Sequence, residues 1–388
     1  MSKKGNFYLT KIPILDNHQR VSGYFLSIKN KEDKPVSVNE LADILVNVNF
    51  EKISGNYPIF LKVSEEVIKH DILDYIPSEK TVIVLEPERL SRGDISLIKG
   101  LKDVGFKFAF EYRGDVEDIL DIADYLFVDV EKVDFSVYQN RNKVILTGIF
   151  STEQFRQFLN EGFKYFKGDF IFKPSVIEEK KIDPSKLAVM ELFTQVRENF
   201  NPPKIEETIK RNPDLSISLL KYVNSAAFSF RSKITSIRHA ISILGQKNLL
   251  QWLLLFLYRA GPDNPYAETL LEVSAERGKT LEILAKMFDL PDDIVEKAFL
   301  VGVLSLADKL LGIPPEELVR ELNLDEDIIK AIIKKEGLLG KLLHIVEKTE
   351  EGKVSEVSDL LDELGLELND VMSAQLQAFA WFEEVNIT

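Results

Sequence analysis

Short apolar runs alternate with amphipathic segments over the first 172 residues of the chain. The runs are rich in Val, Ile, Phe and Tyr, which is typical of β-strands. We predict strands at Val21–Ile28, Pro58–Val63, Thr81–Glu86, Phe106–Glu111, Tyr125–Val130, Lys143–Ile149, Phe163–Phe166 and Phe170–Phe172. Segments between them, such as Val38–Phe50 and Ser151–Asn160, repeat apolar residues at three- and four-residue spacing and predict helices.

This alternation predicts parallel strands joined by helical crossovers. A doubly wound nucleotide-binding sheet would carry a glycine fingerprint, and none is present. Gly100 and Gly105 have the spacing of a phosphate loop, but Phe106 follows where that loop needs lysine. The pattern therefore favours a small (β/α) barrel.

The pattern changes after Lys173–Asp183, a polar and charged segment. Asp183 and Pro184 then form a helix-start signal, and the rest of the chain reads as about ten helices, from typical helix lengths. Proline-containing breaks separate them at Asn201–Pro203, Asn212–Pro213, Gly261–Pro262, Leu290–Pro291 and Ile313–Pro315. We predict an α/β barrel domain at residues 1–180 and an all-α domain at residues 181–388.

Composition narrows the class of protein. The chain has 388 residues, enough for two domains, and no cysteine, which excludes disulfides, thiol nucleophiles and thiolate metal sites. A net charge of −14 argues against generic nucleic-acid binding. The longest apolar run, Leu249–Tyr258, is too short to span a bilayer, and the start of the chain has no secretion signal. We expect a cytoplasmic protein.

Charge is distributed unevenly, because no acidic residue lies between Asp214 and Asp263. We call the basic residues of this gap the cationic island: Lys221, Arg231, Lys233, Arg238, Lys247 and Arg259. Such an island is a candidate docking face for an anionic partner. The alternative is that buried helices contain few acids, which the run Leu249–Tyr258 supports.

Candidate chemistry in a barrel belongs at the carboxyl ends of its strands. Glu86, Glu111 and Asp129 lie at such ends, with Lys62 nearby. Three carboxylates could hold Mg²⁺ or Mn²⁺, although a barrel mouth is commonly polar without holding a metal. The four histidines are scattered and none has a partner at metal-binding spacing.

The motifs of the second half resemble the HDOD domain, an all-helical signalling module related to HD-type phosphohydrolases. They are Asn212–Asp214, Leu219–Ser225, Ile234–Ile237, Ala240–Ile241, Leu244–Gly245 and Ala298–Leu311. The resemblance implies protein partners and places the HD metal-binding pair at Ser305 and Leu306, which cannot hold a metal. Candidate partner-binding residues are Asn224, Ser225, Arg231, Lys233, Arg238 and Lys247.

The first half resembles the EAL domain, the (β/α) barrel that hydrolyses cyclic di-GMP. The resemblance is carried by Ser22–Leu26, Gly105–Tyr112, Ala123–Asp129, Gly162–Gly168 and Phe172–Pro174. It places the signature glutamate at Phe25, the family asparagine at Lys62 and the usual glutamine at Lys167. Glu86, Glu111 and Asp129 remain acidic, whereas other functional positions hold Tyr112, Phe127, Thr147 and Phe150.

Loss of these ligands implies a degenerate EAL domain with no catalytic residues, no metal and no cofactor, because two-metal hydrolysis needs several carboxylates. The candidate nucleotide-binding or vestigial pocket is Lys62, Glu86, Glu111, Asp129 and Lys167. The leading hypothesis is a non-catalytic bacterial signalling scaffold. The alternatives are a cyclic di-GMP sensor without hydrolysis and a residual phosphodiesterase. Family analogy also suggests a homodimer.

Overall fold

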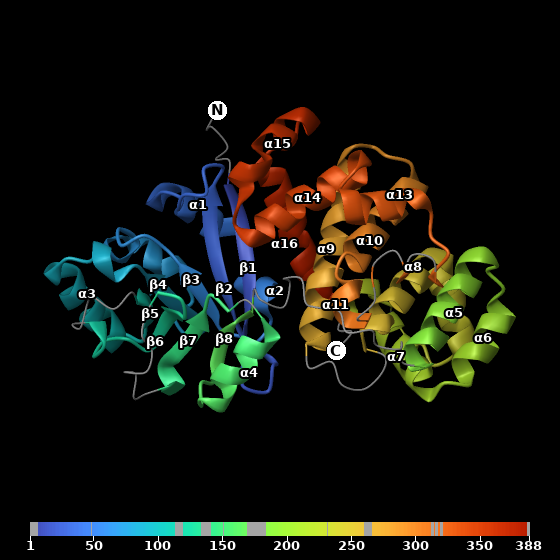
Figure 1. Ribbon diagram of the computed structural model, residues 1–388, viewed down its shortest axis with the longest axis horizontal. Coiled ribbons are helices and arrows are strands. Elements are labelled where there is room, and N and C mark those ends of the chain that lie inside the picture. The colour runs from blue at the N-terminus through green and yellow to red at the C-terminus, as the bar shows by residue number, and fades with distance from the viewer. Residues whose placement is uncertain are drawn as a thin grey trace. The chain divides into compact units, whose positions relative to one another are not determined.

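The protein divides into two compact units, shown as a computed structural model in Figure 1. It describes residues 7–47, 49–112, 119–132, 141–149, 151–168, 184–230, 232–259, 266–311, 314, 317–318 and 321–385. The barrel unit comprises Met1–Ser175 with Glu347–Met372, and the helical unit comprises Val176–Val346 with Ser373–Thr388. The boundary expected near residue 180 lies outside the described residues. Residues 347–372, which the sequence analysis placed in the helical domain, pack with the barrel.

Eight strands close into a barrel in chain order, which confirms the predicted fold class. They are β1 (Phe7–Leu15), β2 (Val21–Asn30), β3 (Ile59–Lys62), β4 (Thr81–Leu85), β5 (Lys107–Tyr112), β6 (Tyr125–Asp129), β7 (Val144–Thr147) and β8 (Tyr165–Lys167). From β2 to β8, each strand pairs in parallel with the next one. Strand β1 closes the barrel and runs antiparallel to both β2 and β8. The expected strand at Phe170–Phe172 lies outside the described residues.

Strand β1 was not predicted, and its burial explains why. Almost every residue of this strand is buried, so the sequence lacks the alternation of a half-exposed strand. Pro13 lies inside it and has no amide hydrogen for a sheet ladder. Lys11, its one residue that is not fully buried, places its ammonium 4.3 Å from the ring centroid of Tyr24 on the neighbouring strand.

Helices and short 3-10 turns cover the outside of the barrel. The helices are α1 (Val38–Asn47), α2 (Phe50–Ser54), α3 (Arg92–Asp103) and α4 (Thr152–Asn160). Helix α3 begins with a capping box, in which Ser91 and Asp94 each accept the other's backbone N–H. These two bonds satisfy backbone amides that the start of a helix otherwise leaves unpaired.

Alternate residues of the strands point into the barrel and fill it. The buried interior cluster consists of Ile12, Ile14, Phe25, Phe60, Val82, Val84, Ala109, Phe127 and Ile145. Aromatic rings meet edge to face there, with centroids 5.3 Å apart for Phe25 and Phe127 and 5.1 Å apart for Phe60 and Tyr125. The interior is therefore a packed apolar core, and the next inward positions along the strands, at their carboxyl ends, form the polar mouth.

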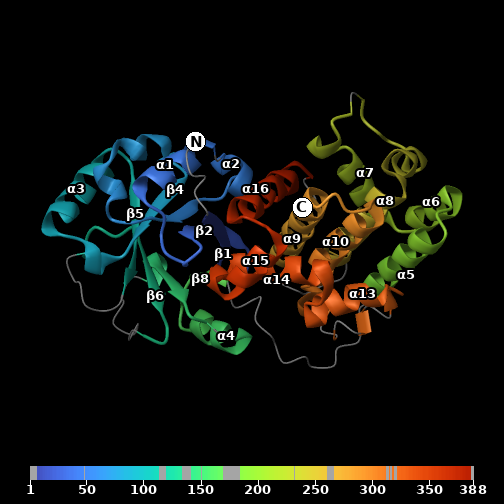
Figure 2. The same cartoon turned by 90° about the horizontal axis from the view of Figure 1, so that it is seen from above.

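The helical unit begins at Pro184 in the described chain. Its helices are α5 (Pro184–Glu198), α6 (Pro202–Lys210), α7 (Pro213–Val223), α8 (Ile237–Arg259), α9 (Ala267–Met287), α10 (Asp292–Leu304), α11 (Ala307–Leu311), α13 (Glu326–Ile329), α14 (Gly337–Glu351) and α16 (Leu368–Val385). The last two also extend into the barrel unit, which contains α15 (Ser358–Leu364). Figure 2 shows α9 and α10 side by side in this unit. Helices α6 and α7 start at the predicted breaks, where Asn201 and Asn212 cap them before proline.

Helix α8 is the one described helix that is long and apolar enough to cross a membrane. Of its most apolar window, 61% is buried inside the structure, as in a core helix. Gly245 also breaks the helical geometry, with φ 67° and ψ −177°. The continuous apolar part after Gly245 is shorter than the roughly 20 residues that a membrane span needs.

Candidate functional site

The mouth of the barrel brings three of the predicted site residues into direct contact. Lys62 ends β3, Glu86 follows β4 and Glu111 lies on β5. The Lys62 Nζ atom lies 3.0 Å from Glu86 Oε1 and 2.8 Å from Glu111 Oε2. One ammonium group therefore bridges the two carboxylates of neighbouring strands.

This bridge is well shielded from solvent, since the Lys62 side chain is 20% exposed. Burial by itself lowers the pKa of Lys62, but the charges of Glu111 and Glu86 and the hydrogen bonds to both outweigh it and raise the pKa above its usual 10.5. The second oxygen of Glu86 accepts a bond from Arg89 Nε at 2.8 Å. A divalent ion would have to displace two basic side chains to reach Glu86.

Asp129 faces a different set of partners at the end of β6. Its carboxylate lies 2.9 Å from Lys132 Nζ and accepts a bond from the Glu131 amide at 3.1 Å. Burial raises its pKa, but these bonds overcome that effect and leave the pKa below the usual 3.8. Gly148 lies against it, because a Cβ there would approach Asp129 Oδ1 to 2.5 Å. Within the described residues, Asp129 has no ion pair with Lys62.

Lys167, at the end of β8, contacts an aromatic ring and pairs with no carboxylate of a described residue. Its ammonium lies 4.8 Å from the centre of the Phe25 ring, at a distance typical of a cation–π contact. Phe25 occupies the position that the EAL resemblance gives to a metal-binding glutamate, and its side chain is 5% exposed in the core. Phe150, another such position, lies outside the described residues.

Lys29 belongs to the same mouth and was missed by the sequence analysis. Burial lowers its pKa, and the nearby charges of Lys62 and Lys167 lower it further, against the opposing effects of Asp33 and Glu111. The signal was available in the sequence, because Phe25, Ser27 and Lys29 alternate along β2 and so share one face. Three lysines thus raise the positive potential of the mouth.

A turn from the far end of the chain covers the β1–β2 side of this mouth. We call residues 349–355, which comprise the last residues of α14 and the segment after it, the C-terminal turn. The backbone oxygen of Thr349 accepts a bond from Thr10 Oγ1 at 3.0 Å, and that of Gly352 accepts one from Lys29 Nζ at 3.3 Å. Asp33 Oδ1 accepts a bond from the Val354 amide at 2.9 Å. Sequence order gives no hint of this contact, because more than 300 residues separate the partners.

Across the part of the chain that the structure describes, no three His, Asp or Glu side chains gather as a metal site. In the helical unit, Ser305 and Leu306 stand where the HDOD resemblance places the HD pair. Ser305 Oγ accepts a bond from Arg277 Nη1 at 2.7 Å and donates one to the Gly302 carbonyl at 2.7 Å. Arg277 is only 5% exposed. A basic side chain, here the buried guanidinium of Arg277, therefore lies at this position, as Lys62 does in the barrel mouth.

Asn224 and Ser225, two candidate partner-binding residues, lie in the loop after α7. The Asn224 amide donates to the carbonyls of Leu220 and Ile234 at 2.6 and 2.7 Å and accepts from the Ile234 amide at 2.7 Å. These bonds close the loop that leads to α8, so the structure gives Asn224 a structural role. The Ser225 hydroxyl oxygen is buried without a hydrogen bond to any described residue.

The cationic island is partly neutralised by acids from outside the sequence gap. Arg238 Nε lies 2.7 Å from Glu206 Oε2, and Lys247 Nζ lies 3.8 Å from Glu296 Oε1. Bonds to Lys210 and Arg238 lower the pKa of Glu206 below 4.5. Lys233 is exposed and makes no ion pair with a described residue, whereas Arg231 lies outside the described residues. The apolar run Leu249–Tyr258 is buried except at the partly exposed Leu250.

Comparison with known proteins extends these findings over the whole chain. Residues 185–311 match the HDOD domain. The chain is 24% identical to the uncharacterized protein YuxH of Bacillus subtilis, over 96% of this chain and 97% of that protein. It is 25% identical to the cyclic di-GMP phosphodiesterase CdgJ of Vibrio cholerae, over 98% of this chain and 93% of that protein.

Among solved structures, the EAL domain of Mycobacterium smegmatis DcpA is 14% identical, with a TM-score of 0.30, covering 42% of this chain and 90% of that domain. The HDOD match coincides with helices α5 to α11 of the helical unit, after a closed eight-stranded barrel. Both full-length relatives align across the two units together. Residues 185–311 therefore match the HDOD domain, and the closed barrel that precedes them is consistent with the EAL–HDOD organisation that the sequence resembles.

Proposed function

We propose that this protein acts in cyclic di-GMP signalling without hydrolysing the nucleotide, and that its HDOD domain binds protein partners. The single observation that carries this proposal is the Lys62 ammonium, bound between Glu86 and Glu111 at 3.0 and 2.8 Å. The link to cyclic di-GMP rests on the EAL resemblance and on the relative named as a phosphodiesterase.

The chemistry of the mouth argues against two-metal catalysis. Such a mechanism needs several carboxylates to hold two ions and to activate a water molecule. Lys62 already neutralises two of the acids and remains protonated at any physiological pH, because its pKa is raised. Its charge repels a divalent cation at close range. Phe25 supplies no oxygen ligand, and Asp129 is engaged by Lys132.

The test is incubation of the purified protein with cyclic di-GMP and Mg²⁺ or Mn²⁺, followed by chromatography of the nucleotide. We expect intact nucleotide from the wild-type protein and from Lys62→Asn, which restores the residue type that the EAL resemblance implies at this position. Metal-dependent turnover that Glu86→Gln abolishes would overturn the proposal and establish a residual phosphodiesterase.

A second candidate function is cyclic di-GMP binding without hydrolysis, and the lysines of the mouth favour it. Lys29, Lys62 and Lys167 lie close enough for Lys62 and Lys167 to lower the pKa of Lys29. A bound phosphate would relieve that repulsion and pair with the lysines. Lys167 has no carboxylate within ion-pair distance among the described residues, so it is the most available of the three.

Calorimetric titration of cyclic di-GMP tests this candidate. We expect Lys167→Glu to weaken binding by at least tenfold. Lys164→Glu is the matched control, because Lys164 is exposed and precedes β8 at the opposite end of the barrel. No heat from the wild-type protein, or equal binding by both variants, would leave only the scaffold function.

A further inference from the structure

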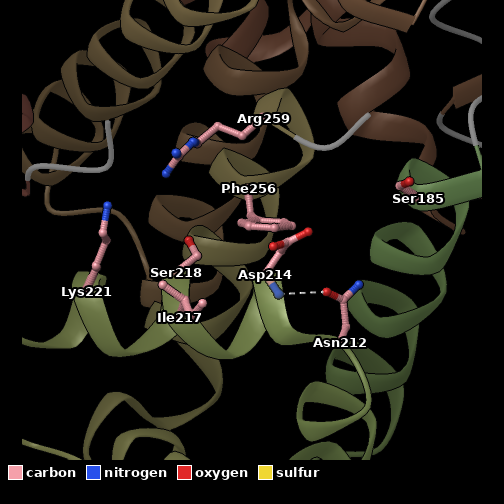
Figure 3. A pocket seen from close by; sticks show the side chains of 8 residues that line it. All are labelled: Ser185, Asn212, Asp214, Ile217, Ser218, Lys221, Phe256 and Arg259. Atoms are coloured by element: carbon pink, nitrogen blue, oxygen red, sulfur yellow. Dashed lines mark hydrogen bonds between the residues drawn. The ribbon is translucent and has the colours of Figure 1, made fainter. Parts of the chain in front are cut away.

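A pocket of about 290 Å³ lies in the HDOD domain, and neither Ser305 nor Arg277 is among its lining residues. Helices α5, α7 and α8 contribute its lining, which consists of Ser185, Asn212, Asp214, Ile217, Ser218, Lys221, Phe256 and Arg259. Its volume is at the lower end of pockets that hold small ligands, roughly 300 to 1,000 Å³. Figure 3 shows these side chains around the opening.

The charges of the pocket are separated along helix α7. Asp214 is in the first turn and Lys221 in the last turn, seven residues apart, so their Cα atoms are about 10 Å apart along the helix axis. Within the described residues, neither side chain makes an ion pair or a hydrogen bond. Arg259, at the end of α8, extends toward the Lys221 side of the pocket in Figure 3. One end of the pocket is thus cationic and the other carries a carboxylate.

Apolar and neutral polar groups lie between these ends. Figure 3 shows the Phe256 ring beside Asp214, below Arg259, and Ile217 forms part of the rim with 58% of its surface exposed. Ser218 Oγ accepts a bond from Trp252 Nε1 at 3.3 Å. Because Ser218 donates to no described residue, its hydroxyl hydrogen is available to a ligand.

We propose that this pocket binds a small phosphate-bearing ligand of mononucleotide size. Lys221 and Arg259 pair with the phosphate, since charge-assisted bonds from lysine and arginine are the usual means of phosphate recognition. The Phe256 ring contacts a planar apolar group, and Asp214 accepts a bond from an amine or hydroxyl at the other end. In a chain of net charge −14, a local excess of two cations over one carboxylate selects the anionic end of the ligand.

This site is independent of the barrel mouth and of cyclic di-GMP. The probe is AMP, titrated calorimetrically into the full-length protein, with adenosine and inorganic phosphate as partial probes. We expect saturable AMP binding that is at least tenfold weaker in Lys221→Glu and in Arg259→Glu. Asp214→Asn should weaken AMP binding and leave inorganic phosphate binding unchanged. Adenosine, which lacks the phosphate, should bind at least tenfold more weakly than AMP.

Two controls separate this result from general charge effects. Lys233→Glu reverses an exposed charge of the same cationic island outside the pocket, and it should leave AMP binding unchanged. Lys167→Glu alters the barrel mouth and should also have no effect. Absence of AMP binding, equal binding by the pocket variants, or loss of binding in Lys167→Glu alone would each overturn the proposal. Circular dichroism confirms that the variants fold, which is expected because Lys221 and Arg259 are exposed.

Discussion

In two regions of this protein, a basic side chain lies where the family resemblances place metal ligands. In the barrel mouth, Lys62 bridges two surviving carboxylates and its side chain is 20% exposed. In the HDOD domain, the Arg277 side chain is buried and donates to the neutral hydroxyl of Ser305. The barrel mouth pairs its lysine with two carboxylates, whereas the HDOD resemblance places Ser305 and Leu306, which carry no charge, at the position of the His–Asp pair.

The difference predicts how each region responds when its cation is removed. Two carboxylates left together repel each other and lose a charged partner, whereas Ser305 loses one hydrogen bond and keeps the one that it donates to the Gly302 carbonyl. The two regions also differ in the chemical type of their cation. A lysine ammonium group ordinarily titrates near pH 10.5, whereas an arginine guanidinium group stays charged.

The largest effect is expected from Lys62→Met. Removing one partner of a buried ion pair costs about 3–5 kcal/mol, and partial exposure of Lys62 lowers our expectation to about 2–3 kcal/mol. Urea unfolding should show this loss in the barrel transition, since two units can unfold separately. Mn²⁺ should restore part of the stability of this variant by binding the freed acids, and Lys164→Met should change stability by less than about 0.5 kcal/mol. An unchanged barrel transition would contradict the bridging role of Lys62.

A smaller loss is expected from Arg277→Met in the HDOD domain. Its hydrogen bond to Ser305 is lost, and a missing buried bond costs about 1–3 kcal/mol. The methionine fills part of the space, and no pair of carboxylates at Ser305 and Leu306 is exposed to a metal. Mn²⁺ should therefore leave the unfolding of this variant unchanged. Stabilisation of Arg277→Met by Mn²⁺ would show that the two regions are more alike than the structure indicates.

The smallest effect is an alkaline dependence that only the barrel shows. The pKa of folded Lys62 is raised above 10.5, so its contribution is complete below that pH and is lost as pH rises through the folded pKa. One proton changes the free energy of unfolding by at most about 1.4 kcal/mol per pH unit. The stability difference between wild type and Lys62→Met should narrow from pH 9 to pH 11. The difference for Arg277→Met should stay constant, as measured by urea titrations at each pH.

Much of the fold was predictable because local patterns carried it. Seven strands of the barrel were found from apolar runs, and α6 and α7 from Asn–Pro signals. Strand β1 was missed because burial on both faces removes the alternation and Pro13 argues against a strand. Packing of residues 347–372 with the barrel could not be predicted, because it depends on contacts between distant parts of the chain.

For the candidate site too, the sequence predicted some features and not others. The sequence alone identified Lys62, Glu86 and Glu111 at strand ends, since parallel strands bring their carboxyl ends to one mouth. It could not show that Lys62 lies between the acids, that Asp129 turns to Lys132, or that Glu206 neutralises Arg238.

The sequence by itself determined the barrel, the helical second half and the family resemblances, because these follow from periodicity and from residues that are close in the chain. Only the tertiary structure decided which charges are paired, since a Coulomb interaction depends on distance in space and on burial. The same reason explains the C-terminal turn at the mouth and the pocket of Lys221 and Arg259, whose residues come from separate segments.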